Sequence, residues 1–307
     1  MASFHLPAYQ TALQTIQQSQ LPHGGFASQP ENQPRTDSTA WAVLALSAFD
    51  ISDDICDRGR GYLQTQQHKN GSLSFSSNHP ETSWPTPIAI LAWHGVKQFQ
   101  TAQQRAVEFL LDFTGAHFEK SSHSAIGHDP SIRGWPWVAH THSWVLPTAL
   151  AMTTLQIAGF PQHQRIDEGK HMLLDRQLPH GGWNSGNTIT FGKELHPLPE
   201  CTGIALQALA SNTPMNQVEK SLDYVLGQWP SLQTPISLGW ALLGLGAWGL
   251  RPANAEEKVL TSLDLQARYG PYSLPSLSLL LCAAQASHGL HSLFGHRSLS
   301  RQHSSSQ

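Results

Sequence analysis

The chain has 307 residues, of which 39% are hydrophobic and only 13% are charged, and its formal net charge is -3. A protein with so weak and slightly negative a charge is not expected to bind nucleic acid. Its cysteines, Cys56, Cys201 and Cys282, are far apart and odd in number, which excludes a disulfide framework and favours a reducing, cytoplasmic compartment.

The first elements along the chain form a helix, loop and helix unit that recurs. A helical pattern over residues 9–18 leads to Gln20-Leu-Pro-His-Gly-Gly-Phe26, and a more apolar helical pattern follows over 39–46. The loop returns almost unchanged as Gln177-Leu-Pro-His-Gly-Gly-Trp183, between patterns at 166–176 and 202–209. Weaker copies of the unit have loops at 67–71, 134–137, 228–229 and 270–272. The sequence therefore predicts six repeats.

The two helices of each unit differ in composition. The first carries charge on one face, as in 105–112 and 167–176, and is expected to touch water. The second is apolar nearly all round, as in 241–248 and 277–282, and is expected to be buried. We predict an all-α closed barrel, an (α/α)6 toroid of twelve helices, with the inner ring near 38–49, 83–95, 143–157, 200–211, 234–247 and 273–286.

The chain is expected to fold as one toroid domain over residues 1–288. The segment 289–307 is polar and rich in Ser, His, Gln and Arg, and such a composition predicts a disordered tail. The first six residues do not resemble a signal peptide, and no apolar run approaches the ~20 residues of a membrane-spanning helix. We therefore expect a soluble protein.

The repeated loop carries a resemblance to a known superfamily. Gln177-x-x-x-Gly181-x-Trp183 matches the QW motif of squalene and oxidosqualene cyclases, and the segment from Gln20 to Phe26 matches it with another aromatic residue. The helix pairs are also similar to those of protein prenyltransferase β subunits. The resemblance to this terpene cyclase and prenyltransferase superfamily covers about Leu6 to Gln285, and it implies a central cavity that holds an isoprenoid chain.

Parallel inner helices would place all their N-termini at one end of the barrel, beside the Gly-aromatic loops. We expect the mouth of the cavity there, since helix N-termini favour negatively charged ligand groups. Tryptophan faces at the mouth could stabilise a carbocation, although aromatic residues of such loops also serve as packing, above all Phe26 and Trp183. The candidate substrate-binding residues are Arg35, Trp41, Glu81, Trp84, Trp135, Trp137, His140, Trp144, Cys201, Trp240 and Tyr272.

The candidate catalytic acids are Asp37 and Glu200, with His142 as the next choice. Each acid stands directly before an apolar inner helix, where burial would keep a carboxyl group protonated, and a protonated carboxyl can start a polyene cyclisation. The alternative is purely structural, because Asp and Glu also stabilise the first turn of a helix without any chemistry.

Two features depart from the resembling families. The cyclases carry an Asp-x-Asp-Asp acid motif, and the nearest string here, Asp50 to Asp54, has the wrong spacing. The prenyltransferases hold zinc with an Asp-x-Cys and a later His, whereas Glu200 and Cys201 are adjacent and the last unit has no matching His. We therefore expect no metal and no cofactor, although His140, His142, His196 and Cys201 offer metal-ligating groups.

The sequence favours a terpene cyclase-like enzyme that binds an isoprenoid or similar apolar chain and catalyses a cofactor-free, acid-initiated cyclisation or isomerisation. One alternative is a non-enzymatic toroid that binds a hydrophobic ligand or a protein. Another is a prenyltransferase β-like protein that needs a partner subunit. Peripheral membrane contact and a homodimer are both compatible with these three functional hypotheses.

Overall fold

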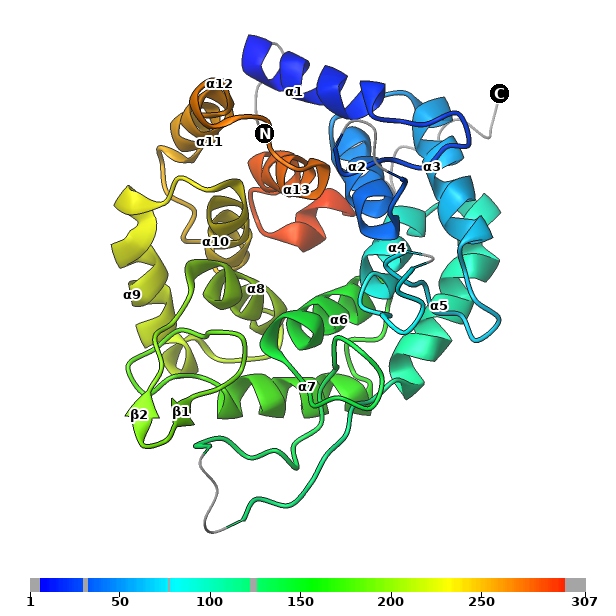
Figure 1. Ribbon diagram of the computed structural model, residues 1–307. Helices are drawn as coiled ribbons and strands as arrows, with labels where there is room; N and C mark the ends of the chain where they lie inside the picture. Colours follow the sequence, from blue (N-terminus) through cyan, green and yellow to red (C-terminus); the bar gives the residue numbers. More distant parts are fainter. Residues whose placement is uncertain (1–5, 30–32, 77, 122–125, 296–307) are drawn as a thin grey trace.

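The computed structural model describes residues 6–29, 33–76, 78–121 and 126–295. Within these ranges the chain forms thirteen α-helices, four short 3-10 turns and one small β-hairpin. Figure 1 shows the helices as two concentric rings, which confirms the predicted all-α toroid. The hairpin consists of β1 (Ile189–Thr190) and β2 (Lys193–Glu194) in antiparallel pairing. No helix in the described part of the chain is long and apolar enough to cross a membrane.

The outer ring consists of the first helix of each repeat. These helices are amphipathic, and α3 for example buries only Cys56, Gly59, Arg60 and Leu63, which lie on one helical face. The four-residue helix α12 (Gln266–Tyr269) follows the last outer helix. The outer helices are α1 (Pro7–Gln18), α3 (Asp53–Thr65), α5 (Gln100–Asp112), α7 (Gln164–Asp175), α9 (Glu219–Gln228) and α11 (Ala255–Asp264).

The inner ring consists of the second helices, and these are buried nearly all round. In the first of them every residue from Thr36 to Ser47 is buried. The observed bounds lie within three residues of the predicted ones, and the largest difference is at the second helix, which has proline at 85 and 87 around its start. The inner helices are α2 (Thr36–Ala48), α4 (Thr86–Trp93), α6 (Val145–Ile157), α8 (Pro199–Leu209), α10 (Pro235–Ala247) and α13 (Leu274–Gln285).

The inner ring is closed. Each inner helix packs against the next in chain order, and α13 packs back against α2, while α1 contacts α11 in the outer ring. Closure buries the apolar faces that the first and last units of an open array would expose. The central layer of the molecule is therefore one continuous apolar core.

The glutamine of the repeated loop ties that loop to the next outer helix. Gln20 Nε2 donates to the carbonyl of Gly24 at 3.0 Å and to that of Ile55, in the first turn of α3, at 2.9 Å. Gln67 makes the same pair of bonds to Gly71 and Ala102. These bonds give the physical reason for a glutamine at the start of the motif.

A threonine at the start of the inner helix holds the other end of the loop. The backbone N–H of Phe26 donates to Thr39 Oγ1 at 2.9 Å, and the N–H of Trp183 donates to Thr202 Oγ1 at 3.0 Å. Leu73 with Thr86 and Trp135 with Thr148 repeat this bond. The loops are thus fixed at both ends, which sets the positions of the residues around the barrel mouth.

The far end of the barrel is covered by the segment that follows α13. Residues Leu290–Leu293 form a 3-10 turn, η4, that contacts α6, α10 and α13 inside the ring. The side chain of Leu290 is fully buried, and its N–H donates to Gln207 Oε1 of α8 at 2.7 Å. The sequence predicts a disordered tail over 289–307, but part of its first stretch, 289–295, packs against the far end of the barrel through this turn. Residues 296–307 lie outside the described residues.

Candidate functional site

A cavity of about 230 Å³ opens at the N-terminal ends of the inner helices. In four inner helices, α2, α6, α10 and α13, two lining residues lie one turn apart, which is the spacing that places side chains on one helical face. Helix α8 contributes no lining residue. The wall consists of Asp37 and Trp41 from α2, Trp84 and Ile88 at α4, Trp137, Leu146 and Leu150 at α6, Ile236 and Trp240 from α10, and Pro275, Ser276 and Leu279 from α13.

Four tryptophans dominate the cavity wall and form two edge-to-face pairs. The ring centroids of Trp41 and Trp240 are 5.9 Å apart, and those of Trp84 and Trp137 are 5.5 Å apart. Helices α2 and α10 are not neighbours in the ring, because α13 lies between them. The contact of Trp41 with Trp240 therefore spans part of the lumen.

Asp37 is the acidic residue of the cavity wall, and it is 2% exposed. Arg35 donates to both of its oxygens, from Nε to Oδ1 at 2.9 Å and from Nη2 to Oδ2 at 2.5 Å. Arginine has donors only, so both oxygens accept, as an ionised carboxylate does. Asp37 therefore forms an ion pair with Arg35, which differs from the protonated carboxyl in an apolar setting that the sequence predicts.

Glu200 and Cys201 begin α8 and do not reach the cavity. Glu200 is half-buried and accepts a hydrogen bond from Ser237 Oγ at 2.8 Å. Burial, followed by the nearby Glu200 charge, raises the pKa of the Cys201 thiol to about 12. The thiol is then protonated at neutral pH, whereas metal binding requires a thiolate. Across the described residues, no group of three or more His, Cys, Asp or Glu side chains is placed to hold a metal ion.

His142 does not line the cavity. Its exposed ring is tilted against that of Trp144, the residue before α6, with the ring centroids 4.2 Å apart. Partial burial, followed by the charge of Arg176, lowers the pKa of His142. His140 and Glu81 are exposed, and neither they nor Trp144 line the cavity.

Trp135 and Tyr272 lie between the two rings of helices, which differs from their expected place in the pocket. Trp135 is 1% exposed, donates from Nε1 to the carbonyl of Leu110 at 2.8 Å and carries the Arg165 guanidinium over its ring. Trp183 makes the equivalent bond to the carbonyl of Leu173. Trp135 thus takes the packing role of the repeat aromatic. The Tyr272 hydroxyl donates to the carbonyl of Ser262 in α11 at 2.7 Å.

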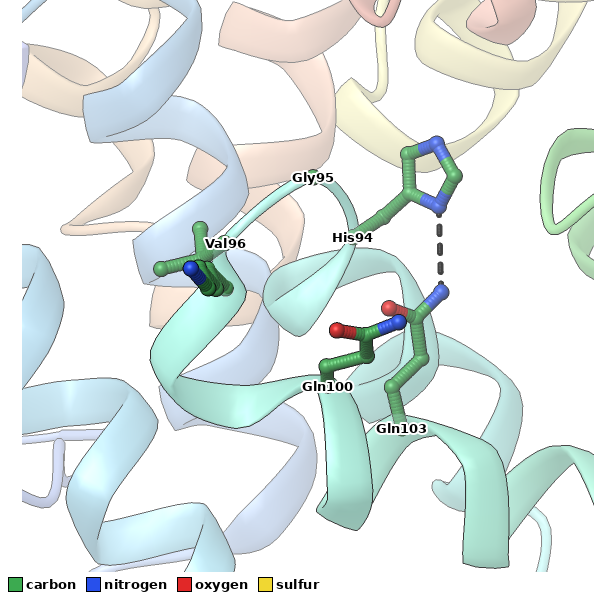
Figure 2. A pocket seen from close by; sticks show the side chains of 6 residues that line it. His94, Gly95, Val96, Gln100 and Gln103 are labelled. Carbon is green, nitrogen blue, oxygen red and sulfur yellow. Dashed lines mark hydrogen bonds between the residues drawn. The ribbon is translucent and has the colours of Figure 1, made fainter. Parts of the chain in front are cut away.

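A second hollow, of about 280 Å³, lies at the opposite end of the ring, where α4 ends (Figure 2). Glutamines and the turn after α4 form its wall, and His94 Nδ1 is 3.1 Å from Gln103 Nε2. Phe294 stacks edge-to-face on His94. None of the residues expected at a site lines this hollow, so the tryptophan-lined cavity is the better candidate.

No family model and no curated protein sequence matches the chain. Solved structures do. A variant of the type II terpene cyclase MstE from Scytonema, in complex with geranylgeranyl dihydroxybenzoate as substrate, is 12% identical, with a TM-score of 0.62 over 92% of this chain and 96% of that one. The chain has a terpene cyclase-like α/α toroid fold.

Other toroids align equally well. A protein from Actinoplanes is 14% identical with a TM-score of 0.61, covering 91% of this chain and 98% of its own. A protein described as an alpha-amylase from Clostridium perfringens is 9% identical with a TM-score of 0.59, covering 90% and 96%. At such identities the likeness concerns the fold alone, and the reaction has to be argued from the site.

The fold brings five of the predicted residues together in the cavity wall: Asp37, Trp41, Trp84, Trp137 and Trp240. Arg35 does not line the cavity but pairs with Asp37. Sequence reasoning missed Ile88 and Ile236, although each lies four residues from a predicted tryptophan, Trp84 or Trp240, and this spacing could have indicated them. It also missed the other lining residues, Leu146, Leu150, Pro275, Ser276 and Leu279. Phe75, a loop residue whose ring centroid lies 4.2 Å from the central carbon of the Arg35 guanidinium, was also missed and has no such signal.

Proposed function

We propose that this protein binds a short isoprenoid or comparable apolar chain in the tryptophan-lined cavity and catalyses its cofactor-free, acid-initiated cyclisation or isomerisation. One observation carries the proposal: Asp37 is the only ionisable side chain among the residues that line an otherwise apolar wall. Burial of a carboxylate costs free energy that its partner only partly repays, so the presence of buried Asp37 in a cavity favours a functional role.

The chemistry assigned to the site is a proton transfer to an alkene. The O–H bond of the acid form of Asp37 breaks and its electron pair stays on the carboxylate. The π electrons of the alkene form the new C–H bond with that proton and leave a cation on the neighbouring carbon. The faces of Trp41, Trp84, Trp137 and Trp240 would stabilise that cation, and a second alkene can close a ring on it. Loss of a proton to the Asp37 carboxylate restores the acid and leaves a neutral product.

This step requires Arg35 to release Asp37. The Arg35 side chain is 30% exposed, so it can turn to solvent when a ligand fills the mouth. The cavity of about 230 Å³ lies just below the usual range of about 300 to 1,000 Å³ for small-molecule pockets, which favours a short chain. The prenyl-type substrate named for MstE supports an isoprenoid ligand on this fold.

The test is incubation with a panel of polyprenyl alcohols and diphosphates, followed by mass spectrometry of the products. Asp37→Asn should abolish turnover and keep ligand binding, measured by quenching of tryptophan fluorescence, because the amide cannot supply the proton. The matched control is Glu200→Gln. The Glu200 carboxyl lies in the first turn of an inner helix but outside the cavity, so this variant should retain turnover. Wild-type turnover by the Asp37→Asn variant would remove Asp37 from the mechanism.

A second candidate is a non-enzymatic protein that binds an apolar ligand. The observation that favours it is the ion pair itself, because Arg35 occupies both oxygens of the one acid in the cavity. Under this alternative the same ligands quench tryptophan fluorescence but no product forms with any substrate of the panel. A metal-dependent prenyltransferase would instead show bound zinc by elemental analysis.

A further inference from the structure

The guanidinium of Arg35 lies in surroundings that recognise organic cations. Its central carbon is 4.2 Å from the centroid of the Phe75 ring, and its nitrogens donate to both oxygens of Asp37. An aromatic face beside a carboxylate attracts a cation through the ring quadrupole and through the opposite charge. The chain thus places one of its own cations in a position suited to a cationic ligand.

The position of Arg35 is continuous with the cavity. The Phe75 ring lies 5.7 Å from that of Trp84, and Trp84 lies 5.5 Å from Trp137 in the cavity wall. Asp37 lies at the junction, because it pairs with Arg35 and also lines the cavity. A ligand with a cationic end could therefore place that end on Phe75 and Asp37 and its apolar part among the tryptophans.

The side chain of Arg35 can leave this position without disturbing the backbone. The N–H of Arg35 donates to the carbonyl of Phe26 at 3.1 Å, and its carbonyl accepts from the N–H and the hydroxyl of Thr39. These bonds hold the start of α2 whatever the side chain does. The 30% exposure of the side chain gives the guanidinium a path to water.

We propose that the cavity mouth is a binding site for an organic cation, a tertiary or quaternary ammonium group on an apolar chain, and that Arg35 occupies this site in the unliganded protein. The incoming ammonium replaces Arg35 on Phe75 and keeps Asp37 paired with a positive charge, so the buried carboxylate is never left alone. The inference rests on the proposed function only in taking this cavity as the ligand site, and it does not require catalysis.

The experiment compares choline with its uncharged analogue, dimethylbutanol, in which carbon replaces the nitrogen. Binding is measured by calorimetry and by tryptophan fluorescence. The wild type should bind choline more tightly than the analogue. Arg35→Ala should raise the affinity for choline about tenfold and leave the affinity for the analogue unchanged. The reason is that removal of an internal competitor worth about 1–2 kcal/mol strengthens only the binding of the cation.

Two further variants make the test specific. Phe75→Leu keeps the ion pair and removes the aromatic face, so it should weaken the binding of choline and leave the binding of the analogue unchanged. Arg133→Ala is the matched control, because Arg133 is 61% exposed and pairs only loosely with Glu168 at 4.0 Å; it should change neither affinity. Circular dichroism checks that each variant is folded, and Phe75→Leu decides the matter if Arg35→Ala does not fold.

An unchanged ratio of the choline affinity to the analogue affinity in both Arg35→Ala and Phe75→Leu would overturn the inference. Binding of polyprenyl alcohols with no binding of choline would also overturn it and would leave the proposed function standing. Absence of binding of choline, the analogue and every polyprenyl alcohol would reject both proposals together.

Discussion

Thr202 shows what a single buried hydroxyl contributes to this fold. It is fully buried, and its Oγ1 accepts the N–H of Trp183. Thr202→Val keeps the side-chain shape but leaves that N–H unsatisfied, so we expect a loss of about 1–3 kcal/mol in the free energy of unfolding by urea. Thr141→Val at an exposed hydroxyl should change it by less than about 0.5 kcal/mol. Equal effects of the two variants would contradict a stabilising role for the hydrogen bond between the Trp183 N–H and Thr202 Oγ1.

His128 makes stability depend on pH. The side chain is 4% exposed, and burial, followed by the charge of Arg176, lowers its pKa to about 4. The unfolded chain, with a pKa near 6.5, therefore takes up the proton first as the pH falls. Neutral His128 contributes at most about 3 kcal/mol to the free energy of unfolding. This contribution is fully present above about pH 6.5 and is lost as the pH falls from there to about 4.

The measurement is urea unfolding at pH 7 and at pH 5. His128→Asn should lose less stability between the two pH values than the wild type does. Lowered pKa values of His117, His142 and His291 act with the same sign, so the variant reduces the dependence without abolishing it. His180→Asn, at a side chain 88% exposed, should keep the wild-type dependence.

The repeated loops depend on glycine where each approaches the next outer helix. Gly181 has a φ of +95°, and a Cβ there would lie 2.5 Å from the carbonyl oxygen of Lys220 in α9. Gly181→Ala should therefore destabilise the protein by about 2 kcal/mol or more, through backbone strain and the clash together. Gly24 and Gly71 have the same conformation and the same close approach, to Arg58 and Arg105.

Gly61 provides the opposite case within α3. A Cβ at this helical position meets nothing within 4 Å. Gly61→Ala should raise the free energy of unfolding by about 0.5–1 kcal/mol, because alanine favours a helix interior. Thermal unfolding of both variants checks the pair, and a stabilising Gly181→Ala would show that the loop does not need its left-handed conformation.

The closed ring makes a prediction about the whole molecule. Because α13 packs on α2 and α1 contacts α11, no repeat in the described part of the chain has a free apolar face. We propose that the toroid unfolds as one domain. Urea curves from tryptophan fluorescence and from circular dichroism should coincide. Leu290→Ala should shift both curves together by about 2–5 kcal/mol, because the side chain is fully buried at the far end of the barrel. Two separated transitions would contradict a single cooperative unit.

Composition and local pattern alone determined the architecture. The recurrence of Gln20 to Phe26 at Gln177 to Trp183, with charged helices before and apolar helices after, predicted six pairs in two rings. These features are local, since each helix carries its own burial pattern. The terpene cyclase-like fold follows from them, and the solved toroids agree with it.

Only the tertiary structure decided which residues form the site. Asp37 and Glu200 occupy similar places at the start of an inner helix, yet only Asp37 lines the cavity, because α8 contributes no side chain to its wall. Trp135 and Trp137 stand two residues apart, yet the first packs between the rings and the second lines the cavity. The rotation of each helix about its axis makes these choices, and it is set by packing with both neighbours in the closed ring, which no local pattern contains.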